Sequence, residues 1–414
     1  MTGVQLYREL VALPYAKPLV GWSLLARLPL GMTPFALLLL VRGEGDGYGT
    51  AGLVVAIYVV ALGLAAPVRG RQVDRRGPAP ILRLGALTYP ACLALIVVLA
   101  LLDAGAPALA VAAVAAGFVH PPIGSAVRIV WPRIATGDLR STAFAFEAAV
   151  QEVFFVVGPL LAAVLATVDP VLAVAGAGLA SLVGTMGLAR LRPIREMPPS
   201  REGGAGLAGA LGSPGVRTVV LYATAIGVSF GAVELAMPAF AEERGARELG
   251  GIALGCFAAG SLVGGLVAGM RPPRDDLRRF LAGAIALAIA LAGLQLAISL
   301  PTLALLAFVA GLPIAPTVAA LYLAIDRTAT QGTAAEAFAW FGTAVSVGFA
   351  LGSAVSGTLV EERGVRWAFG LGAAVALGAA VVGWLRRETF RAERSRPRAE
   401  PLLKAPPGGL EPPT

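Results

Sequence analysis

The sequence predicts an all-α membrane protein in which twelve transmembrane helices form two pseudo-symmetric bundles of six. Three observations support this prediction. Hydrophobic residues make up 57% of the 414-residue chain and charged residues only 14%, against about 25% charged in an ordinary soluble domain. The apolar residues gather in continuous runs of about the 20 residues that a spanning helix needs. The longest interior hydrophilic stretch, 191–216, divides these runs into two sets of six.

Each apolar run is interpreted as a helix. Lipid offers the backbone no hydrogen-bonding partner, and a β-barrel would show alternating polarity instead of continuous runs. In chain order the predicted helices cover 18–41, 48–69, 81–102, 108–131, 142–167, 170–190, 217–241, 249–270, 280–299, 301–325, 334–360 and 365–385.

These runs predict the organisation of the whole chain. Residues 1–17 form a cytoplasmic N-terminus, and residues 18–190 form the first six-helix bundle. Residues 191–216 form a cytoplasmic central loop, and residues 217–387 form the second bundle. The tail, 388–414, is rich in Pro, Glu and Arg without an apolar period. That composition favours a disordered cytoplasmic segment.

The placement of the basic residues predicts the orientation. With the N-terminus inside, most of the 33 Lys and Arg residues fall on the cytoplasmic side, as the positive-inside rule requires. Both termini are then cytoplasmic in a multi-pass protein of the cell (inner) membrane. The net charge of +8 is explained by this asymmetry, so no nucleic-acid partner is expected. We expect a monomer surrounded by membrane lipid.

The two halves show a weak internal repeat. Duplicated six-helix halves are typical of carriers that work by alternating access, with the substrate site between the halves near the membrane midplane. Superposing the second half on the first pairs Tyr58 with Phe257, Gly117 with Gly311, Pro122 with Pro316 and Gly158 with Gly348.

The segment after the second predicted helix carries a recognisable motif. Its residues Gly70, Asp74, Arg75 and Gly77 resemble the G-x-x-x-D-R-x-G signature of the major facilitator superfamily. The resemblance implies that family's fold, and a latch that holds the cytoplasmic side shut in one state. We expect the two glycines to permit a tight turn. We expect Asp74 to lie near the positive end of a helix and to pair with Arg75 or an arginine of another helix. The alternative is a solvated loop that only fixes topology.

The fifth predicted helix carries a second motif. Gly158-Pro159-Leu-Leu-Ala-Ala is similar to the Gly-Pro-x-x-Gly-Gly segment of the family's proton-coupled exporters. The alternative is an ordinary close crossing of two helices, because small residues let backbones approach each other.

Ionisable side chains inside the apolar runs are the candidate site residues, because such residues are costly in a membrane and usually functional. At 1.5 Å per residue, Arg27, His120 and Glu152 lie roughly 14–18 Å deep, near the midplane. We hypothesise that they and Gln151 line the transport cavity, with Glu152 exchanging the coupling proton. The alternative is a fixed Arg27–Glu152 ion pair, and His120 is equally a structural histidine. Glu234 is a second protonation site, a gate residue or a solvated mouth residue.

Two further glutamates are interpreted differently. Glu147 and Glu336 lie near the predicted cytoplasmic ends of the fifth and eleventh helices. There the helix dipole favours carboxylates, so we expect both to be helix-start residues and not substrate ligands. The resemblance implies that the first, fourth, seventh and tenth helices line the cavity, and prolines occur inside each of them.

The sequence offers no catalytic constellation. It has no P-loop, a single histidine and two distant cysteines, Cys92 and Cys256, so no metal site, cofactor or enzymatic activity is expected. The predicted function is secondary active transport of a small organic solute, with export in exchange for protons as the favoured form. One rival is uptake of an organic anion or sugar with Arg27 as a ligand. Others are a lipid flippase and a non-transporting membrane scaffold.

Overall fold

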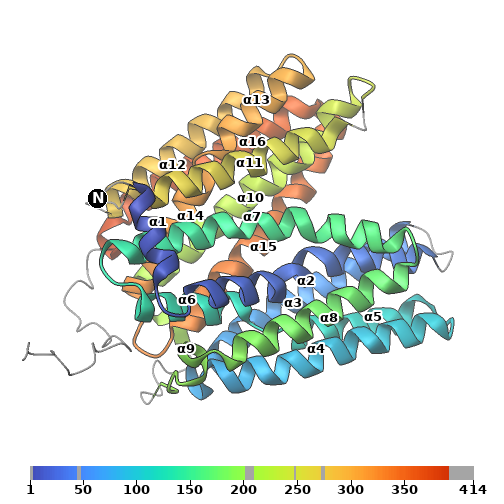
Figure 1. Ribbon diagram of the computed structural model, residues 1–414. Helices are drawn as coiled ribbons and strands as arrows, with labels where there is room; N and C mark the ends of the chain where they lie inside the picture. The colour runs from blue at the N-terminus through green and yellow to red at the C-terminus, as the bar shows by residue number, and fades with distance from the viewer. Residues whose placement is uncertain (1–2, 44–47, 201–208, 247–248, 272–275, 391–414) are drawn as a thin grey trace, which may run out of the picture.

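The computed structural model describes residues 3–43, 48–200, 209–246, 249–271 and 276–390. All regular secondary structure in these ranges is helical (Figure 1). Twelve helical spans are long and apolar enough to cross a membrane. The predicted all-α fold with twelve spans is therefore confirmed. The expected disordered tail lies outside the described residues from 391 onward.

The first half of the chain supplies six spans and two short flanking helices. In order, its elements are α1 (Gly3–Ala12), α2 (Ala16–Gly43), α3 (Tyr48–Arg76), α4 (Pro78–Leu101), α5 (Gly105–Val119), α6 (Ile123–Ile134), α7 (Asp138–Ala166), α8 (Pro170–Arg190) and α9 (Arg192–Arg195).

The second half repeats this arrangement. In order, its elements are η1 (Gly209–Gly212), α10 (Pro214–Glu242), α11 (Gly250–Gly269), α12 (Asp276–Gly293), η3 (Leu294–Leu296), α13 (Leu300–Gly311), α14 (Ile314–Thr328), α15 (Ala334–Arg363), α16 (Val365–Leu385) and η4 (Arg387–Phe390).

The fourth and tenth spans are broken, whereas the sequence predicted continuous helices over 108–131 and 301–325. The fourth breaks between α5 and α6 at residues 120–122, and the tenth breaks between α13 and α14 at 312–313. Pro121, Pro122 and Pro313 lie at these breaks. Proline removes a backbone donor and clashes with the preceding turn. At these two breaks the prolines therefore interrupt the helix instead of only bending it.

A glycine precedes each break and makes an equivalent contact. A Cβ on Gly117 would lie 2.6 Å from the carbonyl oxygen of Tyr58 on α3, and a Cβ on Gly311 would collide with the carbonyl oxygen of Phe257 on α11. The sequence repeat pairs Tyr58 with Phe257 and Gly117 with Gly311. The two halves thus use the same close backbone contact at the same place, which supports their pseudo-symmetry.

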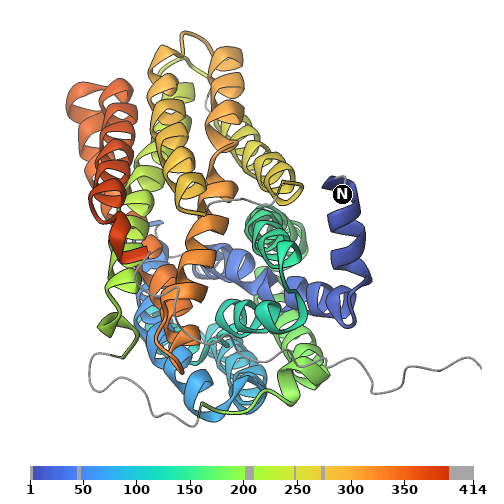
Figure 2. The ribbon, with the colours of Figure 1, turned by 90° about the vertical axis from the view of Figure 1, so that its left-hand side faces the viewer.

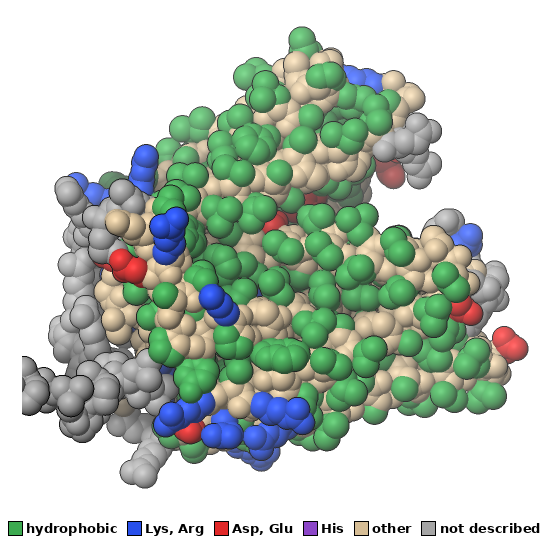
Figure 3. All heavy atoms as spheres, in the orientation of Figure 1, with side chains coloured by type: hydrophobic (Ala, Val, Ile, Leu, Met, Phe, Trp, Pro, Cys, Tyr) green, Lys and Arg blue, Asp and Glu red, His purple; other side chains and the backbone are tan. Residues whose placement is uncertain are grey.

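The spans form two bundles that meet at one end and diverge at the other (Figure 1). Within the bundles, α2 packs on α7 and α8, and α10 packs on α15 and α16. Between them, α3 packs on α15, and α7 packs on α11 and α14. Figure 3 shows the hollow between the bundles, which opens on the side away from the N-terminus. We name this side the open face, and the side that carries α1 the closed face.

Helix α1 is part of this packing, although residues 1–17 were predicted only as a cytoplasmic N-terminus. It packs on α7 and α11, helices of opposite halves, at the edge of the closed face (Figure 2). Leu6 and Leu10 are buried, whereas Val4 and Val11 are exposed. A helix with one packed face and one exposed face of this kind suits the membrane surface.

Candidate functional site

Three buried charged side chains meet where α2, α6 and α7 come together. Arg27 of α2 is 1% exposed, and its guanidinium forms an ion pair with the carboxylate of Glu147 on α7, which is 2% exposed. Arg128 of α6 approaches the same carboxylate, with its Nε 3.7 Å from Oε1. The indole Nε1 of Trp131 donates to Oε2 of Glu147 at 3.4 Å. One carboxylate therefore faces two guanidinium groups.

Gln151 extends this cluster to the second half of the chain. It lies one helical turn after Glu147 on α7, so the two side chains share a face. Its Oε1 accepts hydrogen bonds from Nη2 of Arg128 and from the hydroxyl of Tyr322 on α14, both at 3.0 Å. The guanidinium carbon of Arg128 lies 4.2 Å from the centroid of the Tyr322 ring, which is a cation–π contact. The cluster thus bridges the two bundles.

The hydrogen bonding of this cluster is incomplete. Nε and Nη1 of Arg27 and Nε of Arg128 are buried without a hydrogen-bond partner among the described residues. A buried donor without a partner is costly, and more so when it is charged. The site therefore has spare donors and an excess of positive charge over its single carboxylate. We name Arg27, Arg128, Glu147, Gln151 and Tyr322 the arginine site.

Glu152 lies next to this site on α7 but has a different partner. Its Oε1 accepts a hydrogen bond from Oγ of Ser261 on α11 at 2.9 Å. Glu152 also interacts electrostatically with Tyr322 and with Glu234 of α10. Two carboxylates from opposite halves therefore repel each other between the bundles. Figure 3 shows acidic side-chain atoms between the two bundles.

The alternative of a fixed Arg27–Glu152 ion pair is wrong in this structure, because Arg27 pairs with Glu147. The interpretation of Glu147 as a helix-start residue is also wrong. Helix α7 begins at Asp138, so Glu147 lies more than two turns inside it. Asp138 occupies the helix start instead, where the dipole favours a carboxylate. The matching expectation for Glu336 is correct, since it lies in the first turn of α15.

His120 lies apart from the arginine site. It stands at the break between α5 and α6, and its ring meets the Tyr89 ring edge-on with centroids 4.8 Å apart. The hydroxyl of Tyr89 shares hydrogen bonds with Tyr58 at 2.9 Å and with Thr33 at 2.8 Å. His120 thus lies beside a hydrogen-bonded chain inside the first bundle, and its buried Nε2 has no hydrogen-bond partner among the described residues. None of its described contacts reaches Arg27.

The motif around Asp74 connects the two halves at the closed face. The carboxylate of Asp74 accepts hydrogen bonds from the backbone N–H groups of Ala335 at 3.0 Å and Glu336 at 2.9 Å. These groups belong to the first turn of α15, so Asp74 lies at the positive end of a helix, as the sequence predicted. Arg71 makes a bidentate pair with Glu336, at 3.0 and 2.7 Å.

Two details of that motif, at Gly70 and Arg75, differ from the predictions. Gly70 is not in a turn. It lies inside α3, where a Cβ would be 2.7 Å from the carbonyl oxygen of Ala335, so it permits a close approach of α3 to α15. The turn is made by Gly77, with φ of 78°. The expected pairing of Asp74 with an arginine is not found among the described residues: Arg75 is exposed without a partner there, and the nearby ion pair joins Arg71 to Glu336.

Three further contacts close the same face between α7, α1 and the second half. Arg140 of α7 forms an ion pair with Asp326 of α14. Thr142 donates to the carbonyl oxygen of Gly269 at 2.9 Å. The hydroxyl of Tyr7 on α1 donates to the carbonyl oxygen of Leu266 at 2.9 Å. Burial raises the pKa of Tyr7 to about 12, against an opposing effect of Arg279, so the hydroxyl remains a donor at neutral pH.

Gly158 and Pro159 pack inside the first bundle. A Cβ on Gly158 would lie 2.9 Å from Cα of Gly31 on α2, and a Cβ on Gly31 would lie 3.1 Å from Cδ of Pro159. In the second half, Gly348 of α15 meets α10 in the same way. A close helix crossing accounts for this motif, as the alternative interpretation predicts.

Sequence reasoning did not select Arg128 or Tyr322 as site residues, and it misassigned Glu147. Arg128 lies inside the predicted apolar run 108–131, but so close to its predicted cytoplasmic end that the positive-inside pattern alone accounts for it. A usable signal was present, since Glu147 and Gln151 are spaced one helical turn apart and Gln151 was already a candidate. Tyr322 carries no such signal, because aromatic residues are common in packed helices.

Comparison with known proteins adds a family and a fold. A family model described as "Major Facilitator Superfamily" matches residues 23–294 and 219–411. No curated protein matches the chain. A bacterial homologue of the iron transporter ferroportin, in an outward-facing state, shares 15% identity with a TM-score of 0.72, over 90% of this chain and 99% of its own. The human organic anion transporter MFSD10 (TETRAN) shares 16% identity with a TM-score of 0.70, over 89% of this chain and 100% of its own.

Proposed function

Because this chain belongs to the major facilitator superfamily, which consists of membrane transporters, we propose that it carries a small organic anion with protons as the coupling ion. The observation that carries this proposal is the presence of two buried guanidiniums, those of Arg27 and Arg128, around one carboxylate. In this proposal the protein lies in the cell (inner) membrane. Its two six-helix bundles, 18–190 and 217–387, rock about the site between them.

The arginine site favours an anion for two reasons. Burying an ion costs several kcal/mol unless it is paired, and a substrate carboxylate would supply the pairing that Glu147 alone cannot give to both guanidiniums. The unsatisfied Nε and Nη1 of Arg27 flank the Nη2 group that binds Glu147, so each would offer a separate charge-assisted hydrogen bond to an anion. The organic anion transporter with a similar fold is consistent with this substrate class. The uptake rival with Arg27 as an anion ligand is thus the better supported one.

The two facing glutamates support proton coupling. Because Glu152 and Glu234 carry like charges, a proton bound by either relieves their repulsion. They belong to opposite bundles, so rocking changes their separation and with it the affinity for the proton. A proton on Glu152 also removes a negative charge next to Tyr322 and the arginine site, which strengthens anion binding. The proton and the anion therefore bind together, as in co-transport.

The direction of transport follows from the orientation and the gradient. The excess of Lys and Arg assigns the closed face to the cytoplasm, so the hollow of Figure 3 would open to the outside. Co-transport down an inward proton gradient would then import the anion. Export, which the helix-5 resemblance implies, requires the proton and the solute to move in opposite directions. Export is therefore a separate prediction, and the vesicle experiment described next tests it as well.

The experiment reconstitutes the purified protein in vesicles and imposes a pH gradient of either sign. Small organic carboxylates, neutral sugars and apolar cations are offered as labelled solutes. We expect carboxylate flux that follows the proton flow, with Arg128→Gln raising the KM at least tenfold and the control Arg366→Gln leaving it unchanged. Flux confined to sugars or cations, or an unaffected KM in Arg128→Gln, would refute the anion site.

A second variant tests the coupling. Glu152→Gln should abolish flux driven by the pH gradient but preserve exchange of labelled for unlabelled solute, because exchange needs no net proton movement. Undiminished proton-driven flux in this variant would remove Glu152 from the mechanism. Solute leaving the vesicles as protons enter would show exchange of solute for protons, as the export hypothesis requires, in place of co-transport.

A further inference from the structure

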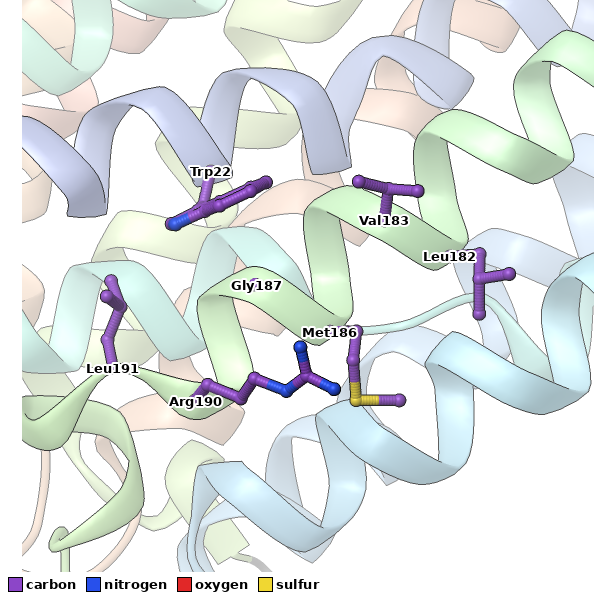
Figure 4. Close-up of a pocket in the computed structure, with 7 residues that line it drawn as sticks. All are labelled: Trp22, Leu182, Val183, Met186, Gly187, Arg190 and Leu191. Atoms are coloured by element: carbon purple, nitrogen blue, oxygen red, sulfur yellow. The ribbon is translucent and has the colours of Figure 1, made fainter.

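We propose that a groove between α2 and α8 binds an anionic phospholipid from the leaflet at the closed face. The groove has a volume of about 390 Å³. Trp22 of α2 forms one wall, and Val183, Met186 and Arg190 of α8 form the other (Figure 4). The groove lies on the outside of the first bundle, separate from the arginine site.

The shape of the groove depends on Trp22 and Gly187. A Cβ on Gly187 would lie 2.7 Å from Cε2 of the indole, so the missing side chain lets the ring lie against the backbone of α8. The indole is 36% exposed. Trp22 lies near the start of α2 and Arg190 ends α8. Both positions are near the closed-face ends of their spans, where we expect the membrane–water interface and where tryptophan is enriched.

Arg190 supplies a positive charge that the protein does not neutralise. Its side chain is exposed and has no hydrogen bond or ion pair within the described part of the chain. The neighbouring Arg192 and Arg195 both pair with Glu196, at 2.8 and 3.5 Å. In Figure 4 the guanidinium of Arg190 extends along the groove beside Met186. A free cation at the mouth of an apolar groove is complementary to a phosphate on a hydrocarbon chain.

The surroundings favour a lipid over a soluble anion. Beyond the arginine, the groove continues along Leu182 and Val183, and Val183 is 42% exposed on the outer surface of the bundle. An acyl chain covers such a surface, whereas a soluble phosphate does not. Lys and Arg side chains also gather at this end of the first bundle (Figure 3), which attracts anionic headgroups.

Lipid titration of the full-length protein tests this proposal. Native mass spectrometry or a thermal shift in detergent measures the binding of dioleoyl phosphatidylglycerol and dioleoyl phosphatidylcholine. We expect the anionic lipid to bind more tightly. Arg190→Gln should weaken its binding roughly fivefold, the effect of one basic residue at a charged interface. Arg366→Gln, at an exposed position of the opposite face, should leave the affinity unchanged.

Two additional measurements identify the source of any binding. Val183→Trp, which fills the groove but retains Arg190, should weaken the binding of both lipids, because the added side chain occupies the space of the acyl chain. Glycerol phosphate, which has the headgroup charge without the acyl chain, should not bind measurably to the unsubstituted protein or to the Val183→Trp variant. Equal affinities for the two lipids, an unaffected Arg190→Gln, or equal losses in Arg190→Gln and Arg366→Gln would overturn the proposal.

Discussion

Asp74 gives the sharpest test of how the closed face is held. Its two carboxylate oxygens accept from two backbone N–H groups of α15, at 3.0 and 2.9 Å. Asp74→Asn preserves the size of the side chain but directs an NH₂ group at one of these donors. One hydrogen bond to a charged group, worth about 1.5–3 kcal/mol, is then lost. The other becomes a weaker, neutral bond.

This loss falls only on the closed conformation, because Asp74 and α15 belong to halves that separate when this face opens. We therefore expect the equilibrium to shift toward opening of the closed face by about 2–3 kcal/mol, or roughly 30- to 150-fold. The assay is the distance distribution between spin labels at Arg83→Cys and Arg217→Cys, in a background with both native cysteines replaced by serine. Both label positions are exposed.

The matched control is Asp138→Asn, which makes the same change at an exposed helix start on the same face. It should leave the distances as they are in the unsubstituted protein. A distribution in Asp74→Asn identical to that of Asp138→Asn would refute the reasoning. The Asp74 carboxylate would then not contribute to closure, and the ion pair of Arg71 with Glu336 and the other contacts of this face would hold it.

Three further predictions concern other contacts. Glu147→Gln leaves two buried guanidiniums without a carboxylate and should destabilise the protein by about 3–5 kcal/mol, seen as a lower melting temperature in detergent. Gly158→Val should cost about 1–3 kcal/mol in the same measurement, because its side chain meets Gly31, and a wild-type melting temperature would contradict this. Tyr7→Phe removes one interbundle hydrogen bond of about 1 kcal/mol and should increase labelling of cysteines placed inside the closed face. Unchanged labelling would show that the Tyr7 hydroxyl does not contribute to closure.

The sequence was sufficient for the spans but not for the pairing of the charges. Continuous apolar runs report burial in lipid directly, which is why twelve spans were found. The contact between Asp74 and a helix start was also predictable, because a carboxylate satisfies free N–H groups there. Pairing is different, since Glu147 and Glu152 lie five residues apart on one helix and point in different directions. Which of them Arg27 reaches depends on how α7 is rotated against α2, and these two helices meet closely at Gly158 and Gly31.

The helix breaks illustrate the same limit. Prolines in the fourth and tenth runs indicated irregular backbone, but a proline either kinks or ends a helix. In this fold the helices end, and Gly117 and Gly311 just before the breaks pack closely on a neighbouring helix. Arg128 then follows the first break within a buried segment and not at a cytoplasmic end. Its place in the arginine site is thus a consequence of tertiary packing that no local pattern contains.

The attachment of α1 has a consequence for biosynthesis. Tyr7 emerges from the ribosome among the first residues, but its acceptor, the carbonyl of Leu266, follows 259 positions later. At about 5–20 residues per second, the N-terminal helix waits ~13–52 s for its docking partner. During that interval its apolar side has only the first bundle or the lipid surface to contact. Assembly of this face is therefore finished late in translation, and a purification tag fused before Met1 would be placed beside one of these late contacts.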